Sequence, residues 1–295
     1  MRVFVTGASG FVGSAVVRQL LRAGHQVTGL VRSEEAATRL RESGAETHTG
    51  NLDQPGTIVT GLKDCDAVIH TAFNHDFSRF KENCELDRKV ILALGDALAG
   101  SGRPLVITSG IGLLSTGRLI TEDDRPADSS VIPRAASEEA AHAVAAKGVK
   151  TYIVRLPPTV HDKGDHGFVP MIIGMAKEKG ESVYIEDGLN HWPAVHRFDA
   201  ANVYKLIAEK QPAQQVYHAV AEEGIPFRQI AETIGKGLNI PTVSKSAAEA
   251  EKHFTWFTHF AKMDCRASSQ QTQDTLGWTP TGDSLMQDLV PGIYF

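Results

Sequence analysis

Apolar and polar residues follow two different periods along the first half of the chain. Compact segments rich in β-branched residues predict strands at 3–5, 27–31, 46–49, 67–69, 105–107 and 151–154. Between them, apolar residues recur three and four positions apart and predict helices at 12–21, 34–43, 77–99 and 135–146. Strands that alternate with such helices form a parallel sheet covered on both faces. The first half is therefore predicted to be a doubly wound α/β domain.

The regular alternation of strands and helices ends after Arg155. The later segments with a clear pattern are a polar loop at 162–167, a strand at 216–220 that returns to the sheet, and helices at 226–238 and 247–257. We therefore expect a sheet domain at 1–160 and a smaller lobe made mainly of 161–295. No low-complexity linker separates the two parts, so they should share an interface.

Composition narrows the classes of partner. The chain has 295 residues, of which 42% are hydrophobic, and a net charge of −5 without a long basic run, so a nucleic-acid partner is not expected. No apolar run approaches the roughly 20 residues that span a bilayer, and a first strand that begins at Arg2 or Val3 leaves no room for a signal peptide. Cys65, Cys84 and Cys265 are too scattered for a metal site or a disulfide framework. These features predict a cytoplasmic protein without a membrane partner.

Three glycines stand between the first predicted strand and the first predicted helix. In this context glycines allow a tight turn and let backbone N–H groups approach a diphosphate, which the positive end of the helix also attracts. The pattern predicts a Rossmann-type dinucleotide-binding domain. The residues of this loop expected to contact the cofactor are Gly7, Ser9, Gly10, Phe11, Val12 and Gly13.

The residues after the second strand bear on the choice of nucleotide. Arg32 stands where an NAD-specific site carries an acidic residue, and an arginine suits the 2′-phosphate of NADP(H) instead. Ser33 would add a hydrogen bond, whereas the nearby Glu34 and Glu35 argue against the phosphate. We expect NADP(H) to be preferred over NAD(H). Further expected cofactor contacts follow the third and fourth strands, at Asn51, Leu52, Thr71, Ala72 and Phe73. His70, which precedes them, is interpreted as a half-buried, hydrogen-bonded structural residue rather than a catalyst.

Taken together, these segments resemble the extended short-chain dehydrogenase/reductase family. The matching blocks occur in family order over nearly the whole chain, at 6–13, 66–72, 108–110, 155–160, 194–201 and 276–280. The resemblance implies a Rossmann-type sheet domain, a smaller C-terminal substrate-binding lobe and a nicotinamide cofactor. The chain is most similar to an atypical subgroup of the family that keeps the cofactor motif and lacks the usual Tyr-x-x-x-Lys pair.

The resemblance also locates the departure from the family pattern. The positions of the catalytic Tyr and Lys fall at Arg134 and Glu138, whereas Ser109 matches the residue that polarises a carbonyl. Thr108, beside Ser109, is expected to contact the cofactor. An arginine donates protons poorly but stabilises an oxyanion, and a glutamate shuttles protons if burial raises its pKa. Alternatively, the two side chains form a helix-surface ion pair at i and i+4. Pro157 and Pro158 match the segment that lines the nicotinamide.

One histidine after this proline segment is a further candidate. His161 would act as a proton donor near neutral pH, or it is structural or faces solvent. The neighbouring His166, Asp162 and Asp165 lie in a glycine-broken loop without cysteine partners, so no metal site is expected.

The sequence therefore predicts an NADP(H)-dependent oxidoreductase that acts on a small, fairly apolar carbonyl compound or alcohol. Residues that either pack in the second lobe or favour such a substrate are Phe168, Met171, Trp192, Trp256, Phe257 and Phe260. Two alternatives stay open: a non-catalytic NADP(H) sensor that binds another protein, and a lyase, isomerase or epimerase. Relatives of this family often pair through the helices at 77–99 and 135–146, which leaves a homodimer open.

Overall fold

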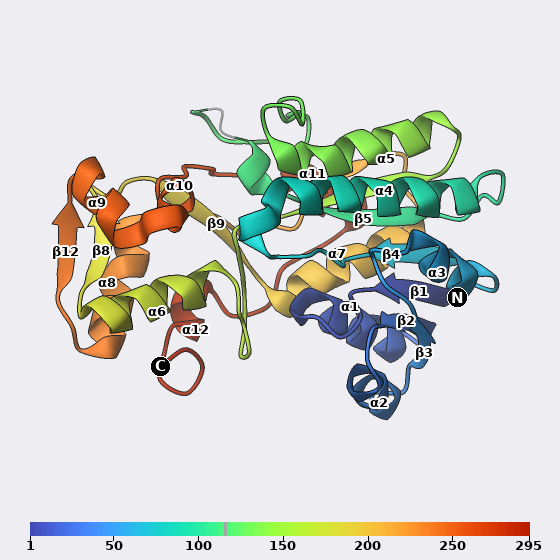
Figure 1. Cartoon of the computed structure of the whole chain (residues 1–295), viewed down its shortest axis with the longest axis horizontal. Coiled ribbons are helices and arrows are strands. Elements are labelled where there is room, and N and C mark those ends of the chain that lie inside the picture. Colours follow the sequence, from blue (N-terminus) through green and yellow to red (C-terminus); the bar gives the residue numbers. More distant parts are fainter. Residues whose placement is uncertain (115–116) are drawn as a thin grey trace.

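The computed structural model of the protein describes residues 1–114 and 117–295. A parallel sheet with the order β10-β6-β5-β4-β1-β2-β3 lies at one end of the molecule (Figure 1). Its strands are β1 (Arg2–Thr6), β2 (Gln26–Val31), β3 (Glu46–Thr49), β4 (Ala67–His70), β5 (Leu105–Gly110), β6 (Thr151–Leu156) and β10 (Val216–His218). The strand order reverses between β1 and β4, and ligands of such sheets bind at the carboxyl ends of the strands beside that reversal. The predicted Rossmann-type α/β fold is confirmed.

Helices cover both faces of this sheet. One face carries α1 (Phe11–Arg22), α2 (Glu34–Glu42), α7 (Arg197–Lys210) and α11 (Gln270–Leu276), and the other carries α3 (Pro55–Val59), α4 (Phe80–Leu98) and α5 (Ala136–Ala146). Successive side chains of a strand point to opposite faces, so Val3 and Val5 join the first core and Phe4 joins the second. The helix predicted from residue 77 begins as a single 3-10 turn, Phe77–Arg79, before α4.

The second lobe has its own core around buried aromatic residues such as Trp192, Phe227 and Phe254. Its helices are α6 (Phe168–Lys179), α8 (Phe227–Leu238), α9 (Ala247–Phe254), α10 (Thr258–Ala261) and α12 (Leu285–Asp288). Its two-stranded sheet pairs β8 (Ser182–Ile185) with β12 (Thr242–Lys245). A further sheet, β11 (Glu222–Pro226), β9 (His191–His196) and β7 (Thr159–His161), runs between the two lobes. The helix predicted at 247–257 ends at Phe254 and continues as a 3-10 turn.

The C-terminal half contributes more to the first domain than the sequence indicated. The predicted return at 216–220 is present, because β10 pairs in parallel with β6. In addition, Tyr204 of α7 and Trp278 after α11 are fully buried in the core that includes Val3. A parallel sheet needs cover on both faces, and α7 supplies it beside α1.

Among the helices of residues 1–114 and 117–295, none combines the length and the apolar character that crossing a bilayer requires. Cys65, Cys84 and Cys265 are buried and free. Burial raises the pKa of the Cys84 thiol to about 11 and that of Cys265 to about 12. Both thiols therefore stay protonated and unreactive at neutral pH.

Candidate functional site

The turn between β1 and α1 is built so that only glycine fits at two of its positions. Gly7 has a φ of +67°, and a Cβ there would lie 2.7 Å from Thr71 Oγ1 and 2.8 Å from the Ala72 nitrogen. A Cβ at Gly13 would lie 2.0 Å from the Gly7 carbonyl oxygen. The glycines thus allow α1 and the end of β4 to approach the turn closely.

The first turn of α1 offers backbone donors to a ligand. The helix begins at Phe11, directly after the loop, and within the described part of the chain no side chain caps it at Gly10. The N–H groups of a helix's first turn have no partner inside the helix and carry partial positive charge. This arrangement fits the diphosphate of a dinucleotide, which Phe11, Val12 and Gly13 would hold through their backbone N–H groups, with Ser9 exposed at the turn. The Gly10 N–H instead donates to the Gly7 carbonyl at 2.8 Å and closes the turn, which corrects the expectation that it binds the cofactor.

Arg32 directly follows β2 and is exposed. The two nearby carboxylates that argued against a 2′-phosphate are engaged elsewhere, because Glu34 pairs with Arg41 at 2.6 Å and Glu35 pairs with Arg39. Within residues 1–114 and 117–295, no ion pair or hydrogen bond holds the Arg32 side chain. Its charge is therefore available to a ligand at this end of β2.

The other residues expected near the adenosine lie at the same edge of the sheet. Ser33 caps α2 by accepting a hydrogen bond from the Ala36 N–H at 3.3 Å, which leaves its own O–H proton available. Asn51 follows β3 and accepts a bond from the Asp53 N–H at 3.3 Å, while Leu52 is half-buried. Their roles toward a cofactor stay predictions.

The end of β4 is fastened to the glycine loop. The Thr71 hydroxyl donates to the Thr6 carbonyl at 2.7 Å, and the Ala72 N–H donates to the Thr6 hydroxyl at 3.3 Å. The chain then turns so that the ring of Phe73 lies 4.2 Å from the Arg134 guanidinium carbon. Thr71, Ala72 and Phe73 therefore connect the phosphate-binding turn to the position of the missing Tyr.

Arg134 is held as a fixed cation beside the carboxyl end of β5. Its Nη1 pairs with Asp87 Oδ2 at 3.0 Å and also contacts Ser137, and its Nη2 donates to the Thr108 carbonyl at 3.0 Å. These contacts use three of the five N–H donors of a guanidinium, and the other two have no partner among the described residues. The side chain keeps 14% of its surface exposed. Arg134 is thus oriented by the protein and still open to a ligand.

A series of buried hydrogen bonds links Arg134 through Asp87 and His70 to Thr6. Burial opposes the charge of Asp87, but Arg134 and His70 outweigh that effect and lower the pKa of this carboxyl. His70 donates from Nε2 to Asp87 at 2.9 Å, and its Nδ1 lies 2.7 Å from the Thr6 hydroxyl. His70 is hydrogen-bonded at both ring nitrogens, which agrees with the structural role predicted from the sequence. It is only 1% exposed and is therefore more deeply buried than predicted.

Glu138 does not pair with Arg134, so the predicted helix-surface ion pair does not form. Its carboxylate is buried and accepts two bonds from Arg155, each 2.8 Å long. Burial raises the pKa of Glu138, but the ion pair and hydrogen bonds with Arg155, together with the bond from Ser109, lower it overall. The raised pKa that a proton shuttle needs is therefore absent, which corrects that expectation.

Ser109 lies at the carboxyl end of β5 and is 4% exposed. Its hydroxyl donates to Glu138 Oε1 at 2.6 Å. Because a hydroxyl has one proton, Ser109 presents only acceptor lone pairs in this geometry. The neighbouring Thr108 hydroxyl donates to the His70 carbonyl at 2.8 Å. Of the residues expected to hold a substrate oxygen, Arg134 alone has free donors in this arrangement.

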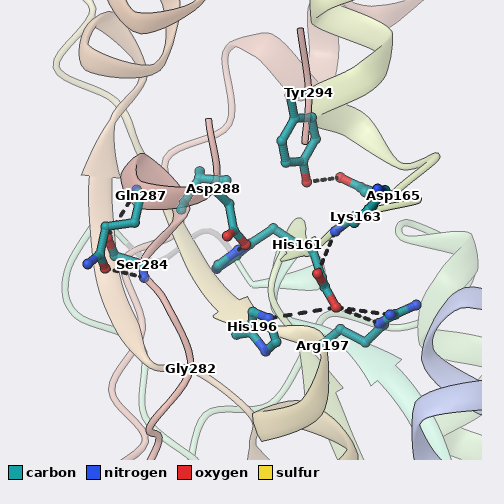
Figure 2. Close-up of polar contacts among 12 residues, drawn as sticks. His161, Lys163, Asp165, His196, Arg197, Gly282, Ser284, Gln287, Asp288 and Tyr294 are labelled. Carbon is teal, nitrogen blue, oxygen red and sulfur yellow. Dashed lines mark hydrogen bonds and ion pairs between the residues drawn. The ribbon is translucent and has the colours of Figure 1, made fainter. Parts of the chain in front are cut away.

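His161 is the last residue of β7, and its ring lies next to Asp288 of α12 (Figure 2). Its side chain has no exposed surface, its Nδ1 donates to Asp288 Oδ2 at 2.6 Å, and its Nε2 has no partner within hydrogen-bond distance among the described residues. The solvent-facing alternative is wrong. Contact with a substrate would require α12 to move, so this geometry favours the structural alternative. Pro157, which is buried, and Pro158, which is partly exposed, follow β6 before this residue.

Sequence reasoning missed two charged residues of the site. Asp87 belongs to the same buried face of α4 as Asn83, Val90 and Ile91. Arg155 is a charged residue inside an otherwise apolar buried strand. A charge at a core position is costly unless it is paired, so both positions carried a signal that could have been read from the pattern.

Comparison with known proteins agrees with this geometry. Residues 7–184 match the model of a family described as NAD(P)H-binding. An uncharacterized protein of Schizosaccharomyces pombe is 51% identical over 295 residues, which are the whole of both chains. A 4-hydroxy-2-methyl-3-oxo-4-farnesyl-3,4-dihydroquinoline-1-oxide ketoreductase of Stigmatella aurantiaca is 27% identical over 86% of this chain and 79% of its own. The dTDP-glucose 4,6-dehydratase DesIV of Streptomyces venezuelae shares the fold, with a TM-score of 0.79, 18% identity and coverage of 99% and 96%.

The chain therefore belongs to the NAD(P)H-binding family, and its resemblance to extended short-chain dehydrogenases/reductases is confirmed. This places it in a superfamily of NAD(P)-dependent oxidoreductases and epimerases. That Arg134 and Glu138 take the places of the family's Tyr and Lys stays a prediction from the sequence.

Proposed function

We propose that the protein is an NADP(H)-dependent oxidoreductase that interconverts a small, fairly apolar carbonyl compound and its alcohol. The observation that carries this proposal is Arg134, a cation held by Asp87 and the Thr108 carbonyl beside the dinucleotide turn, with two N–H donors free. An oriented cation with an exposed surface is what a developing oxyanion requires.

Each residue near Arg134 would have a distinct role in the reduction of a carbonyl group. A bound reduced nicotinamide supplies a hydride. Arg134 would bind the substrate oxygen and stabilise its negative charge, while Asp87 and Ser137 fix the direction of the guanidinium. Because a guanidinium remains protonated in proteins, the proton that completes an alcohol would come from solvent. Pro157 and Pro158 would line the nicotinamide.

The preference for NADP(H) rests on Arg32. It is exposed, and Glu34 and Glu35 are paired with arginines of α2, so neither neutralises it. A guanidinium binds a phosphate through two parallel hydrogen bonds. The Ser33 hydroxyl retains a proton for the same phosphate.

The apolar character of the substrate is inferred from aromatic residues near Arg134. From Phe73, under Arg134, ring contacts run to Phe80 at 6.3 Å, then to Phe77 at 5.7 Å and on to Trp256 at 5.3 Å. Trp256 is 52% exposed, whereas Trp192 and Phe257 are fully buried and belong to the core. Phe168, Met171 and Phe260 are half-buried. The exposed end of this aromatic series favours a substrate with an apolar body.

A cytoplasmic location and a homodimer belong to the same proposal. Three buried, free cysteines suit a reducing compartment. A dimer would pair α4 and α5, which lie side by side on one face of the sheet (Figure 1). Light scattering of the purified protein tests this, since a monomer at micromolar concentration would exclude it.

The experiment that tests the function is NADPH oxidation against a panel of aldehydes, ketones and enones, with the binding of NADPH and NADH measured alongside. We expect turnover with at least one apolar member and tighter binding of NADPH than of NADH. Tight binding without any turnover would favour a sensor. Conversion of a substrate without net NADPH consumption would favour a lyase or an epimerase.

A further inference from the structure

We infer that Arg197 is an additional ligand of the cofactor's diphosphate and that Asp162 restrains it. This inference rests on the proposed function, because it requires a bound dinucleotide. Arg197 is the first residue of α7, and its guanidinium carbon lies 4.7 Å from the centre of the Phe11 ring. Phe11 begins α1, whose N-terminal donors fit a diphosphate. Arg197 therefore lies beside the phosphate-binding turn although it is distant in sequence.

The contacts of Arg197 leave part of its guanidinium free. Its Nε and Nη2 lie 3.1 and 2.9 Å from the same oxygen, Asp162 Oδ2 (Figure 2). The other oxygen of Asp162 accepts the Lys163 N–H at 2.6 Å, and His196 Nε2 lies 3.7 Å from Oδ2. Among the described residues, the remaining three N–H donors of Arg197 have no partner. The side chain is 20% exposed.

Two further contacts hold this pair next to the turn. The ring of His166, from the loop that also carries Asp162, lies 5.8 Å from that of Phe11. Tyr294, near the C-terminus, donates to Asp165 Oδ2 at 2.7 Å and so ties the same loop to the second lobe. The loop is thereby fixed over one side of the α1 N-terminus, with Asp162 as the partner that holds Arg197 when no phosphate is present.

The charges explain why the two residues act in opposite directions. A diphosphate is doubly anionic, and a guanidinium binds phosphate oxygens with short, charge-assisted hydrogen bonds. Arg197 would therefore strengthen dinucleotide binding. Asp162 adds negative charge at the same place and competes for the same guanidinium, so it would weaken binding.

The test measures dissociation constants of NADPH and NADH by fluorescence for the wild type, Arg197→Ala and Asp162→Asn. The matched control is Arg18→Ala, because Arg18 is exposed on α1 and its guanidinium contacts the Phe198 ring at 5.2 Å, as that of Arg197 does at 4.9 Å. Adenosine 2′-monophosphate, which lacks the diphosphate, is the second probe. Thermal unfolding of each variant is recorded in parallel.

We expect Arg197→Ala to weaken NADPH binding about tenfold or more, as the loss of a charge-assisted bond to phosphate should. Arg18→Ala should bind as the wild type does, and adenosine 2′-monophosphate should bind all variants equally. Asp162→Asn should bind NADPH more tightly, and added salt should reduce these differences. Wild-type affinity in both Arg197→Ala and Asp162→Asn would overturn the inference. A wild-type protein that binds neither dinucleotide would instead overturn the proposed function.

Discussion

At the scale of single residues, the predicted replacement of the family's catalytic Tyr by Arg134 would change which part of a reaction the protein assists. A tyrosine at this position gives or takes a proton, whereas a guanidinium stays charged and only stabilises an anion. Two neighbouring side chains suit an arginine at this position. Asp87 neutralises the arginine from inside α4, and Phe73 covers one face of it at 4.2 Å. The site is therefore organised around a fixed charge.

Replacing Arg134 with methionine tests this role. The methionine keeps the apolar contact with Phe73 and removes the charge, so kcat/KM should fall about 100-fold or more, which is typical for the loss of an oxyanion donor. The dissociation constant of NADPH should change little. Lys147→Met, at an exposed pair with Asp96, is the control and should leave both quantities unchanged. An unchanged kcat/KM in Arg134→Met would contradict the role.

The pH dependence of catalysis tests the same claim by another route. A guanidinium supplies charge without exchanging a proton, so kcat/KM should be nearly flat between about pH 6 and 9. A group that titrates within this range would indicate a proton-donating side chain instead. His161→Asn would then show whether His161 is that donor, since the buried, Asp288-bonded geometry predicts that it is not.

Arg32→Ala tests the nucleotide preference. Removing two charge-assisted bonds to the 2′-phosphate should raise the dissociation constant of NADPH about 10- to 100-fold and leave that of NADH unchanged. Arg22→Ala is the matched control, because Arg22 is an exposed arginine at the C-terminal end of α1 and its removal leaves the pairs of Glu34 and Glu35 intact. Equal losses for both nucleotides would mean that Arg32 acts on something other than the 2′-phosphate.

At the scale of elements, Glu138 and Arg155 join α5 to β6 by a buried ion pair. Both side chains are at most 2% exposed, and the pair also holds Ser109 at the end of β5. Two charges that satisfy each other in the interior are tolerated, but either one alone is costly. Glu138, predicted to take the place of the family's Lys, thus connects α5 to β6 and to the end of β5.

Glu138→Met or Arg155→Met alone should destabilise the fold by about 3–5 kcal/mol, because each leaves an unpaired buried charge. The double variant should recover much of that loss, and urea unfolding measures all three. Asp96→Ala at the exposed pair with Lys147 should cost at most about 1 kcal/mol. A double variant as unstable as the sum of the single variants would show that the two residues do not act as a pair.

At the scale of the whole molecule, His218 links the edge of the main sheet to the C-terminal segment. Its Nδ1 donates to the Ser268 carbonyl at 2.7 Å, and its Nε2 faces the Nη1 of Arg155 at 3.3 Å. Burial, followed by the charge of Arg155, lowers the pKa of His218 to about 4. The folded protein therefore keeps this histidine neutral at a pH where the unfolded chain protonates it.

Stability should consequently fall as the pH is lowered from about 6.5 to 4. The unfolded state binds the extra proton in this window, so stability rises with pH through it and the full contribution of up to about 3 kcal/mol is present above pH 6.5. Chemical unfolding between pH 4 and 7 measures the slope. His218→Gln should flatten it, whereas His259→Gln, at an exposed position, should not. An unaltered slope in His218→Gln would assign the pH dependence to other groups.

The strand and helix pattern was sufficient for the sheet, including the return of β10, because local periodicity determines each of these elements. The packing of α7 against α1 and the burial of Trp278 could not be predicted, because they depend on contacts between segments that are distant in the sequence. The same limit applied to the site. The glycine turn and Arg134 were visible as motifs, but the partners of Arg134 and Glu138 come from α4 and β6 and were not.

The central claim is that this chain transfers a hydride between NADP(H) and an apolar carbonyl compound with an arginine in place of the tyrosine. The most direct measurement incubates the protein with NADPH that is dideuterated at the nicotinamide C4 and with the carbonyl panel, followed by mass spectrometry of the products. We expect one deuterium on the reduced carbon of a product, formed together with NADP⁺ and greatly diminished in Arg134→Met. Bound NADPH with no deuterium in any member of the panel would contradict it.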